Sequence, residues 1–215
     1  MSNKKVKELL KNGSIAFNEN KFKDAIKILE EAANIDEYNR DVLILLAIAC
    51  QKVGNLEKSI EWYIKITHNF DDDANIFYQL AAVLAQNQDQ LRALEYMEKA
   101  VQLKPENGDY WYALSVTYMM GDKQEKALDA LEKTVKFSPD HDLAWATLGA
   151  VHSNLDQDEK AIEYIEKSLK INPKNADAWF ALAVSYMKME QKGKAKDCLA
   201  KAAELNPNYK DKLEL

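Results

Sequence analysis

Hydrophobic positions along this chain recur at intervals of three and four residues, the spacing that places side chains on one face of an α-helix. The whole pattern then returns every 34 residues. Within each 34-residue segment, positions 4, 7, 8 and 11 share one face of a first helix, and positions 20, 24 and 27 share one face of a second helix. The pattern therefore predicts an all-α protein built from antiparallel helix pairs whose apolar faces meet.

The prolines define the frame of this repeat. All four of them occupy position 32, at Pro105, Pro139, Pro173 and Pro207. A proline there ends the second helix and begins the next pair. Counting back predicts an extension at 1–5, a tail at 210–215 and six repeats between them, at 6–39, 40–73, 74–107, 108–141, 142–175 and 176–209. We refer to position n of the repeat as column n.

Several columns hold one kind of residue in every repeat. Column 4 is bulky, with Leu9, Leu43, Phe77, Trp111, Trp145 and Trp179. Column 8 is small, with Gly13, Ala47, Ala81, Ser115, Gly149 and Ala183. Column 20 is also small, with Ala25, Ser59, Ala93, Ala127, Ala161 and Ala195. Small residues facing each other let the two backbones approach closely, while a single pair cannot bury its apolar face alone. Neighbouring pairs must therefore stack.

Taken together, the columns read W-L-G-Y-A-F-A-P, a spacing that resembles the tetratricopeptide repeat family over nearly the whole chain. An ordinary helical bundle would not hold this phase through six repeats. The resemblance implies a right-handed superhelical α-solenoid whose concave wall is formed by the first helices. It also implies a non-catalytic scaffold or adaptor that binds a protein or peptide partner.

In the family, columns 2, 5, 6, 9, 12 and 13 line the concave wall. Most of these positions are apolar or aromatic here, although they lie off the stripe that joins the two helices of a pair. The candidate groove residues are Ile44, Leu45, Ile48, Tyr78, Gln79, Tyr112, Val116, Met119, Met120, Phe180, Val184 and Met187. Exposed apolar surface of this extent indicates a groove for an extended or helical peptide. The alternative is that some of these side chains pack between adjacent repeats.

Chaperone-adaptor members of the family grip a terminal carboxylate with a clamp of lysine, asparagine and arginine side chains. The matching positions of the first three repeats hold no cation, and they read Leu10, Ser14, Leu45, Asn75 and Gln79. A carboxylate would lose its hydration there without gaining a charged partner. We therefore expect recognition through apolar anchors and hydrogen bonds.

The last repeat suggests a second function. Few residues follow it, so Leu199, Ala202 and Ala203 are expected to be exposed and could stack on another copy of the chain. Residues 35–49 are also loosely similar to the magnetosome-surface members of the family. The alternatives to a simple adaptor are therefore a self-assembling, homo-oligomeric scaffold and the recruiting subunit of an enzyme carried on another chain.

Composition and charge limit the kinds of partner that the protein can bind. The net charge of −6 argues against nucleic acid and against docking on anionic lipid by charge alone. The longest apolar run, Val42 to Cys50, is too short to insert directly into a membrane. Two distant cysteines fit a reducing compartment, and we expect a cytoplasmic location.

No constellation for catalysis, metal binding or a cofactor is evident. His68 and His141 are placed in loops, and His152 takes column 11, where a packing role is expected. Burial should raise the pKa of the Cys50 thiol and make it unreactive, whereas lysines near Cys198 in the sequence make the Cys198 thiol the more reactive one. The run of Asp71, Asp72 and Asp73 is interpreted as a capped helix start. Column 23 carries Trp62, Tyr96 and Tyr164, which either pack within their repeats or form a second, convex binding face.

Overall fold

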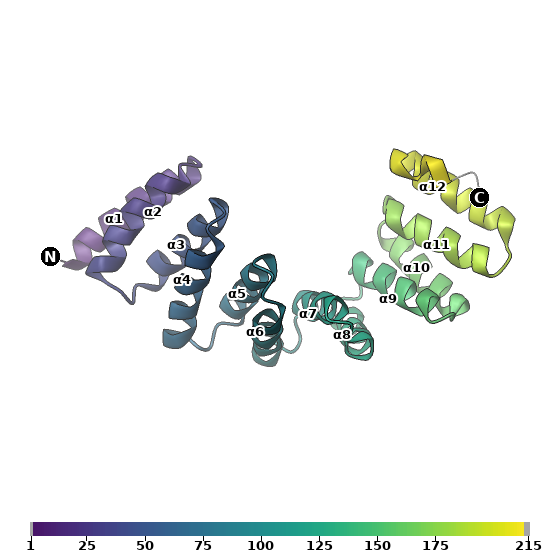
Figure 1. Ribbon diagram of the computed structural model, residues 1–215, viewed down its shortest axis with the longest axis horizontal. Coiled ribbons are helices and arrows are strands. Elements are labelled where there is room, and N and C mark those ends of the chain that lie inside the picture. Colours follow the sequence, from purple (N-terminus) through teal and green to yellow (C-terminus); the bar gives the residue numbers. More distant parts are fainter. Residues whose placement is uncertain (1, 213–215) are drawn as a thin grey trace. The chain divides into compact units, whose positions relative to one another are not determined.

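The computed structural model describes residues 2–212, and that part of the chain consists of twelve α-helices and one short 3₁₀ helix, without strands (Figure 1). The helices divide between Pro105 and Glu106 into two compact units of three helix pairs each. The all-α, helix-pair prediction is therefore confirmed. The boundary between the units lies two residues before Asn107, where the proline frame ends the third repeat.

Unit 1 holds the first three repeats. Its helices are α1 (Ser2–Asn18), α2 (Phe22–Ile35), α3 (Arg40–Lys52), α4 (Leu56–Asn69), α5 (Ala74–Gln86) and α6 (Gln90–Leu103). Residues 2–5 continue helix α1 without a break. Each odd-numbered helix packs against the even-numbered helix that follows it, and α2 and α4 also contact the next pair.

Unit 2 holds the last three repeats. Its helices are α7 (Gly108–Met120), α8 (Gln124–Phe137), α9 (Asp142–Asn154), α10 (Asp158–Ile171), α11 (Ala176–Lys188), α12 (Lys192–Leu205) and the 3₁₀ helix η1 (Pro207–Lys212). From the second repeat onward, every first helix begins at the residue where the proline frame begins the repeat.

Column 34 explains why these helices begin where they do. Its residue is the N-cap of the next first helix, and its side chain accepts a hydrogen bond from a backbone N–H of the first turn, which would otherwise lack a partner. The caps are Asn39, Asp73, Asn107, His141 and Asn175. The interpretation of the aspartate run is confirmed, because Asp73 caps α5 through the N–H of Asn75 at 2.9 Å.

The turn inside each repeat depends on column 15. Its residue has a positive φ in all six repeats, at Asn20, Gly54, Gln88, Asp122, Asp156 and Glu190. Only one of the six is glycine, although the left-handed region is costly for other residues. Five repeats therefore hold a non-glycine residue in this conformation so that the second helix can fold back on the first.

The small columns bring the paired helices into contact. All residues of columns 8 and 20 are buried. At Gly149 a Cβ atom would lie 2.9 Å from the backbone carbonyl oxygen of Ala161 and would also overlap the side chain of Ile165. The facing stripe of the second helices is equally buried, with column 24 filled by Leu29, Tyr63, Met97, Leu131, Ile165 and Leu199.

The expectation for the last repeat is wrong. Leu199, Ala202 and Ala203 are only 5%, 0% and 5% exposed. Leu199 packs in the cluster shared with α11, and α12 as a whole contacts both α11 and η1. Helix η1 then covers part of α11. The Tyr209 ring stacks on Phe180 with 4.7 Å between centroids, and its hydroxyl donates to Asp177 at 2.6 Å.

Candidate functional site

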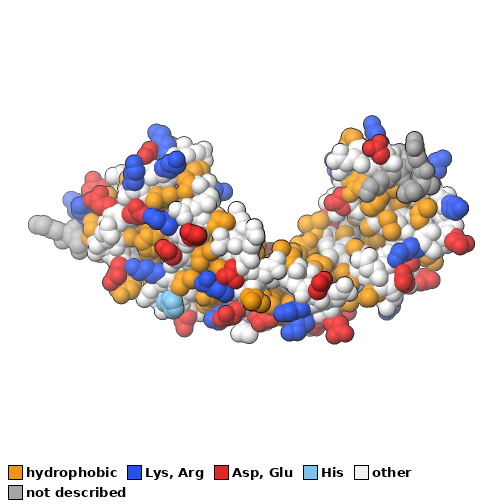
Figure 2. All heavy atoms as spheres, viewed as in Figure 1, with side chains coloured by type: hydrophobic (Ala, Val, Ile, Leu, Met, Phe, Trp, Pro, Cys, Tyr) orange, Lys and Arg blue, Asp and Glu red, His pale blue; other side chains and the backbone are white. Residues whose placement is uncertain are grey.

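The candidate groove residues lie on first helices, and each unit presents its own set. We call these sets the first-helix face of unit 1 (Ile44, Leu45, Ile48, Tyr78 and Gln79) and the first-helix face of unit 2 (Tyr112, Val116, Met119, Met120, Phe180, Val184 and Met187). Hydrophobic side chains reach the surface between charged ones in both units (Figure 2). The two faces differ in how far their side chains are committed to packing.

The first-helix face of unit 1 is largely part of its core. All five residues are partly buried. Ile44, Leu45 and Ile48 pack against the buried cluster formed by helices α1 to α6. The alternative of packing within the repeats therefore accounts for much of the apolar character of α3. Less of its side-chain surface is left for a partner.

The first-helix face of unit 2 keeps more of its surface free. Met120 is 55% exposed and Val184 is 37% exposed. The other five residues are partly buried, and among them Tyr112, Phe180 and Met187 also pack against the buried clusters of unit 2. On α7, Tyr112, Val116 and Met119 follow at intervals of four and three residues, so their side chains share one side of the helix. Exposed methionines supply an adaptable apolar surface of the kind used for binding varied partners.

Tyr112 is held by a histidine of the next repeat. The rings of Tyr112 and His141 lie 4.4 Å apart. His141 is also the N-cap of α9, where its Nδ1 accepts the N–H of Ala144 at 3.1 Å. The ring proton therefore lies on Nε2, which is 3.8 Å from Asp109. These contacts join the starts of α7 and α9 and fix the orientation of the tyrosine ring.

Small residues on α9 complete this face and were missed in the sequence. Ala146 and Ala150 occupy columns 5 and 9, the same columns as Phe180 and Val184 on α11, and both are partly buried. Ala146 packs against the cluster of α11 and α12. Their column positions predict them, whereas a pattern of bulky apolar side chains does not include alanines. Because only methyl groups project from α9 at these columns, its surface is recessed relative to the larger side chains of α11.

Charge is sparse on the first-helix face of unit 2. Its only lysine at the wall columns is Lys188, which pairs with Asp156 at 3.1 Å and also donates to the carbonyl of Ser153. The carboxylates of Asp109 and Asp177 lie at column 2, and Asp109 is 79% exposed. The face thus combines an apolar surface with negative charge near the starts of α7 and α11. Because Lys188 is already paired, these columns of unit 2 offer no unpaired cation for a free carboxylate.

The column 23 aromatics lie against their own repeats. Tyr96 stacks on Phe77 with 6.1 Å between centroids, and Tyr164 lies 5.7 Å from Trp145 and 5.2 Å from His152. His152 itself is buried and its Nδ1 is 2.8 Å from Gln157 Oε1, which confirms the packing role. The placement of His68 in a loop is wrong, whereas His141 lies in the connection between α8 and α9 as predicted. His68 belongs to the last turn of α4, and His141 caps α9.

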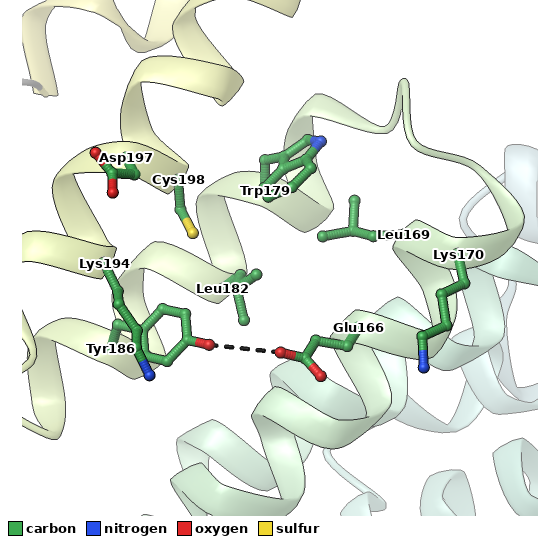
Figure 3. A pocket seen from close by; sticks show the side chains of 9 residues that line it. All are labelled: Glu166, Leu169, Lys170, Trp179, Leu182, Tyr186, Lys194, Asp197 and Cys198. Carbon is green, nitrogen blue, oxygen red and sulfur yellow. Dashed lines mark hydrogen bonds between the residues drawn. The ribbon is translucent and has the colours of Figure 1, made fainter.

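The two cysteines behave alike. Burial raises the pKa of the Cys50 thiol, as expected from its column. The expectation of a reactive Cys198 is wrong, because burial, followed by the charges of Asp197 and Glu166, raises its pKa to about 11. Two of the nearby lysines have other partners, since Lys194 lies over the ring of Tyr186 and Lys201 pairs with Glu204. Cys198 instead forms one wall of a cavity between α10, α11 and α12 (Figure 3).

Neither a cluster of metal ligands nor a membrane-spanning helix occurs in the described part of the chain. Residues 2–212 contain no group of three or more histidine, cysteine or acidic side chains placed to hold a metal ion. None of the helices in the same range is long and apolar enough to cross a membrane.

Comparisons with known proteins agree with this geometry. The fold is shared with PilF of Pseudomonas aeruginosa (16% identity, TM-score 0.79, 99% of this chain and 98% of that chain covered). It is also shared with YrrB, described as a TPR protein with an unusual peptide-binding site (23% identity, TM-score 0.71, 87% and 98% covered). A third similar structure is MamA (22% identity, TM-score 0.71, 76% and 95% covered). At these identities the likeness shows the fold alone.

Comparison of the sequence with family models identifies the kind of repeat. The comparison with curated proteins gave no match. One tetratricopeptide repeat model matches residues 16–84 and 155–213, and another matches residues 78–142. The residues matched by the first model make up more than half of the chain, so the protein belongs to the tetratricopeptide repeat family.

Proposed function

We propose that this protein is a non-catalytic scaffold or adaptor that binds a segment of a partner polypeptide on the first-helix face of unit 2. One observation carries the proposal. Tyr112, Val116, Met119 and Met120 on α7, with Phe180, Val184 and Met187 on α11, are apolar residues at the wall columns, and Met120 and Val184 are exposed. Apolar surface that is not needed for folding is typical of a binding site.

The chemistry of this face favours a particular kind of segment. Large apolar side chains of the partner can contact Val116, Met119 and Val184, and the recessed surface over Ala146 and Ala150 leaves room for them. Asp109 and Asp177 favour a basic residue beside the apolar ones, since opposite charges steer association and fix the register. We therefore favour an extended or helical segment of apolar residues flanked by lysine or arginine. The description of YrrB as peptide-binding supports this class of ligand.

Self-assembly through the last repeat has weaker support. Leu199, Ala202 and Ala203, which were predicted to form the contact with another copy, are buried. Tyr209 also covers Phe180. Light scattering over a concentration series separates the two functions, because an adaptor remains monomeric and a stacking scaffold grows with concentration. The role of recruiting subunit differs from the adaptor only in the identity of the partner. A cytoplasmic location stays part of the proposal and is supported by two free cysteines.

The test begins with peptides selected from a random display library on the full chain. Tyr112→Ala combined with Met119→Ala should weaken the selected peptides about tenfold or more, because anchoring aromatic and methionine side chains are lost. Leu155→Ala combined with Ile171→Ala is the matched control, since both residues are exposed and lie off the first-helix face. Circular dichroism checks that both variants remain helical. Equal affinity for the wild type and the Tyr112/Met119 variant would exclude the proposed site.

A further inference from the structure

A cavity of about 400 Å³ opens between helices α10, α11 and α12 of unit 2. Its apolar walls are formed by Trp179 and Leu182 of α11, Leu169 of α10 and Cys198 of α12 (Figure 3). Four charged side chains also line it, two lysines and two carboxylates: Lys170, Lys194, Glu166 and Asp197. The volume lies within the range of about 300–1,000 Å³ that is usual for small ligand sites.

The preceding repeat fills the corresponding space with its own aromatic ring. There, column 23 holds Tyr164, whose ring lies 5.7 Å from Trp145 at column 4 and 5.2 Å from His152 at column 11. In the last repeat the same columns hold Cys198, Trp179 and Tyr186, and all three line the cavity. A cysteine in place of a tyrosine removes the ring, while the residues that would surround it are kept.

The third repeat packs in the same way. Tyr96 at column 23 stacks on Phe77 at column 4 with an interplanar angle of 20°. The chain therefore places an aromatic ring against column 4 in two other repeats. The last repeat keeps a large aromatic residue at column 4 and lacks the ring at column 23.

Lysines indicate which kind of ring fits. In the fifth repeat, Lys167 at column 26 lies 4.8 Å from the ring of Trp145 and 5.2 Å from that of Tyr164. The last repeat has Lys201 at this column, but Lys201 pairs with Glu204 at 2.7 Å. Lys170 and Lys194 supply positive charge at the edge of the cavity instead. Cations are attracted to the faces of electron-rich rings, and the carboxylates of Glu166 and Asp197 can accept a hydrogen bond from an indole N–H or a phenol O–H. The two kinds of charge together complement an indole or a phenol.

We propose that this cavity is a socket for a tyrosine or tryptophan side chain presented by a partner polypeptide. The bound ring takes the place that Tyr164 has in the fifth repeat and lies against Trp179. The indole N–H of Trp179 already donates to the carbonyl of Pro173 at 2.9 Å, which holds the wall of the socket in position. The socket lies among second helices and α11, away from the residues of the first-helix face, so it is a second contact whose test can fail independently of the proposed function.

The test is a titration of the ¹⁵N-labelled full chain with a short peptide that carries one central tryptophan among serines and glycines. The indole N–H signal of Trp179 should shift saturably with this peptide and stay unchanged with the same peptide carrying alanine. Cys198→Tyr places the chain's own ring in the socket, so the tryptophan peptide should bind about tenfold more weakly or not at all. Ala200→Tyr is the matched control, because it adds the same ring to an exposed position of α12 and should leave binding unchanged.

A second variant covers the case in which Cys198→Tyr does not fold. Lys170→Glu combined with Lys194→Glu reverses the charge at the edge without touching the core, and it should weaken the tryptophan peptide. The absence of a saturable Trp179 shift would overturn the proposal, as would unchanged affinity in a folded Cys198→Tyr variant. Binding of free indole without binding of the peptide would also overturn it. So would self-association of the wild type that Cys198→Tyr abolishes, because the occupant would then be a second copy.

Discussion

The fifth and sixth repeats share one architecture and differ in a few columns. Both have a tryptophan at column 4, a leucine at column 7 and an alanine at column 20. The fifth fills the space beside its tryptophan with Tyr164, whereas the sixth has Cys198 and leaves a cavity. The shared columns determine that a helix pair forms. Single departures from a column determine where the surface opens, so the function of such an array resides in the residues that break its repeat.

The exchange of column 23 should give the largest effect. Tyr164→Cys imports the residue of the sixth repeat into the fifth and removes a ring packed between Trp145 and His152. We expect the free energy of unfolding to fall by about 3 kcal/mol, measured by urea denaturation with circular dichroism. Cys198→Ala is the control and should cost about 1 kcal/mol, because the sixth repeat already lacks the ring. Equal losses would show that the two spaces are not equivalent.

Column 8 provides the next comparison, since Gly149 and Ala183 occupy it in the two repeats. Gly149→Ala introduces a methyl group 2.9 Å from the carbonyl oxygen of Ala161 and should destabilise the protein by about 2 kcal/mol. The same substitution at Gly193, where the space is open, should stabilise helix α12 by about 0.5–1 kcal/mol. Melting temperatures of the two variants should therefore move in opposite directions. A gain in stability at Gly149 would contradict the close approach of α9 and α10.

The caps of the two repeats differ as well. Asn175→Ala removes the side chain that accepts the N–H of Ala178 at 3.0 Å, and it should cost about 1 kcal/mol in urea denaturation. His141→Asn replaces the histidine cap of the fifth repeat with the residue used in the sixth, so the cap is kept. Its stability should change little, although the contact with Tyr112 is lost. If His141→Asn lowers the free energy of unfolding as much as Asn175→Ala does, the contact between the rings of His141 and Tyr112 contributes to stability as much as a cap does.

The smallest effect on stability at neutral pH is expected from the ionisation of the Cys198 thiol, which is measured through its reactivity. Because the pKa of Cys198 is raised to about 11, its thiol is protonated at pH 7 and should react slowly with iodoacetamide. The rate should rise about tenfold per pH unit up to that pKa. Burial of the neutral thiol also means that this contribution to stability is present below the pKa of the unfolded state and is lost as the pH rises toward 11. Mass spectrometry of native and urea-unfolded protein measures the difference, and equal rates would contradict the burial.

Periodic features of the molecule were predictable from the sequence. The proline frame located the start of every first helix from Arg40 to Ala176, because a 34-residue phase leaves no freedom in where a helix pair begins. Columns 8, 20 and 24 identified the buried contacts for the same reason. These features repeat, so each repeat supports the interpretation of the others.

Features that occur once were not predictable. Tyr209 covers Phe180 through a 3₁₀ helix that no other repeat has, and Cys198 is buried although lysines surround it in the sequence. His141 reaches Tyr112 from the next repeat. Ala146 and Ala150 were not predicted because they are small, and a pattern of large apolar residues does not mark small ones as surface residues of a site. Each of these depends on contacts between residues that only the folded chain brings together.

The methionines provide the most direct test of polypeptide binding on the first-helix face of unit 2. Met119, Met120 and Met187 belong to this face, whereas Met97 is buried in unit 1 with 4% exposure. In a full chain labelled with ¹³C at the methionine methyl groups, a saturating selected peptide should shift the signals of the first three and leave that of Met97 in place. If the peptide binds and the signals of Met119, Met120 and Met187 do not move, the partner lies elsewhere and the account is contradicted.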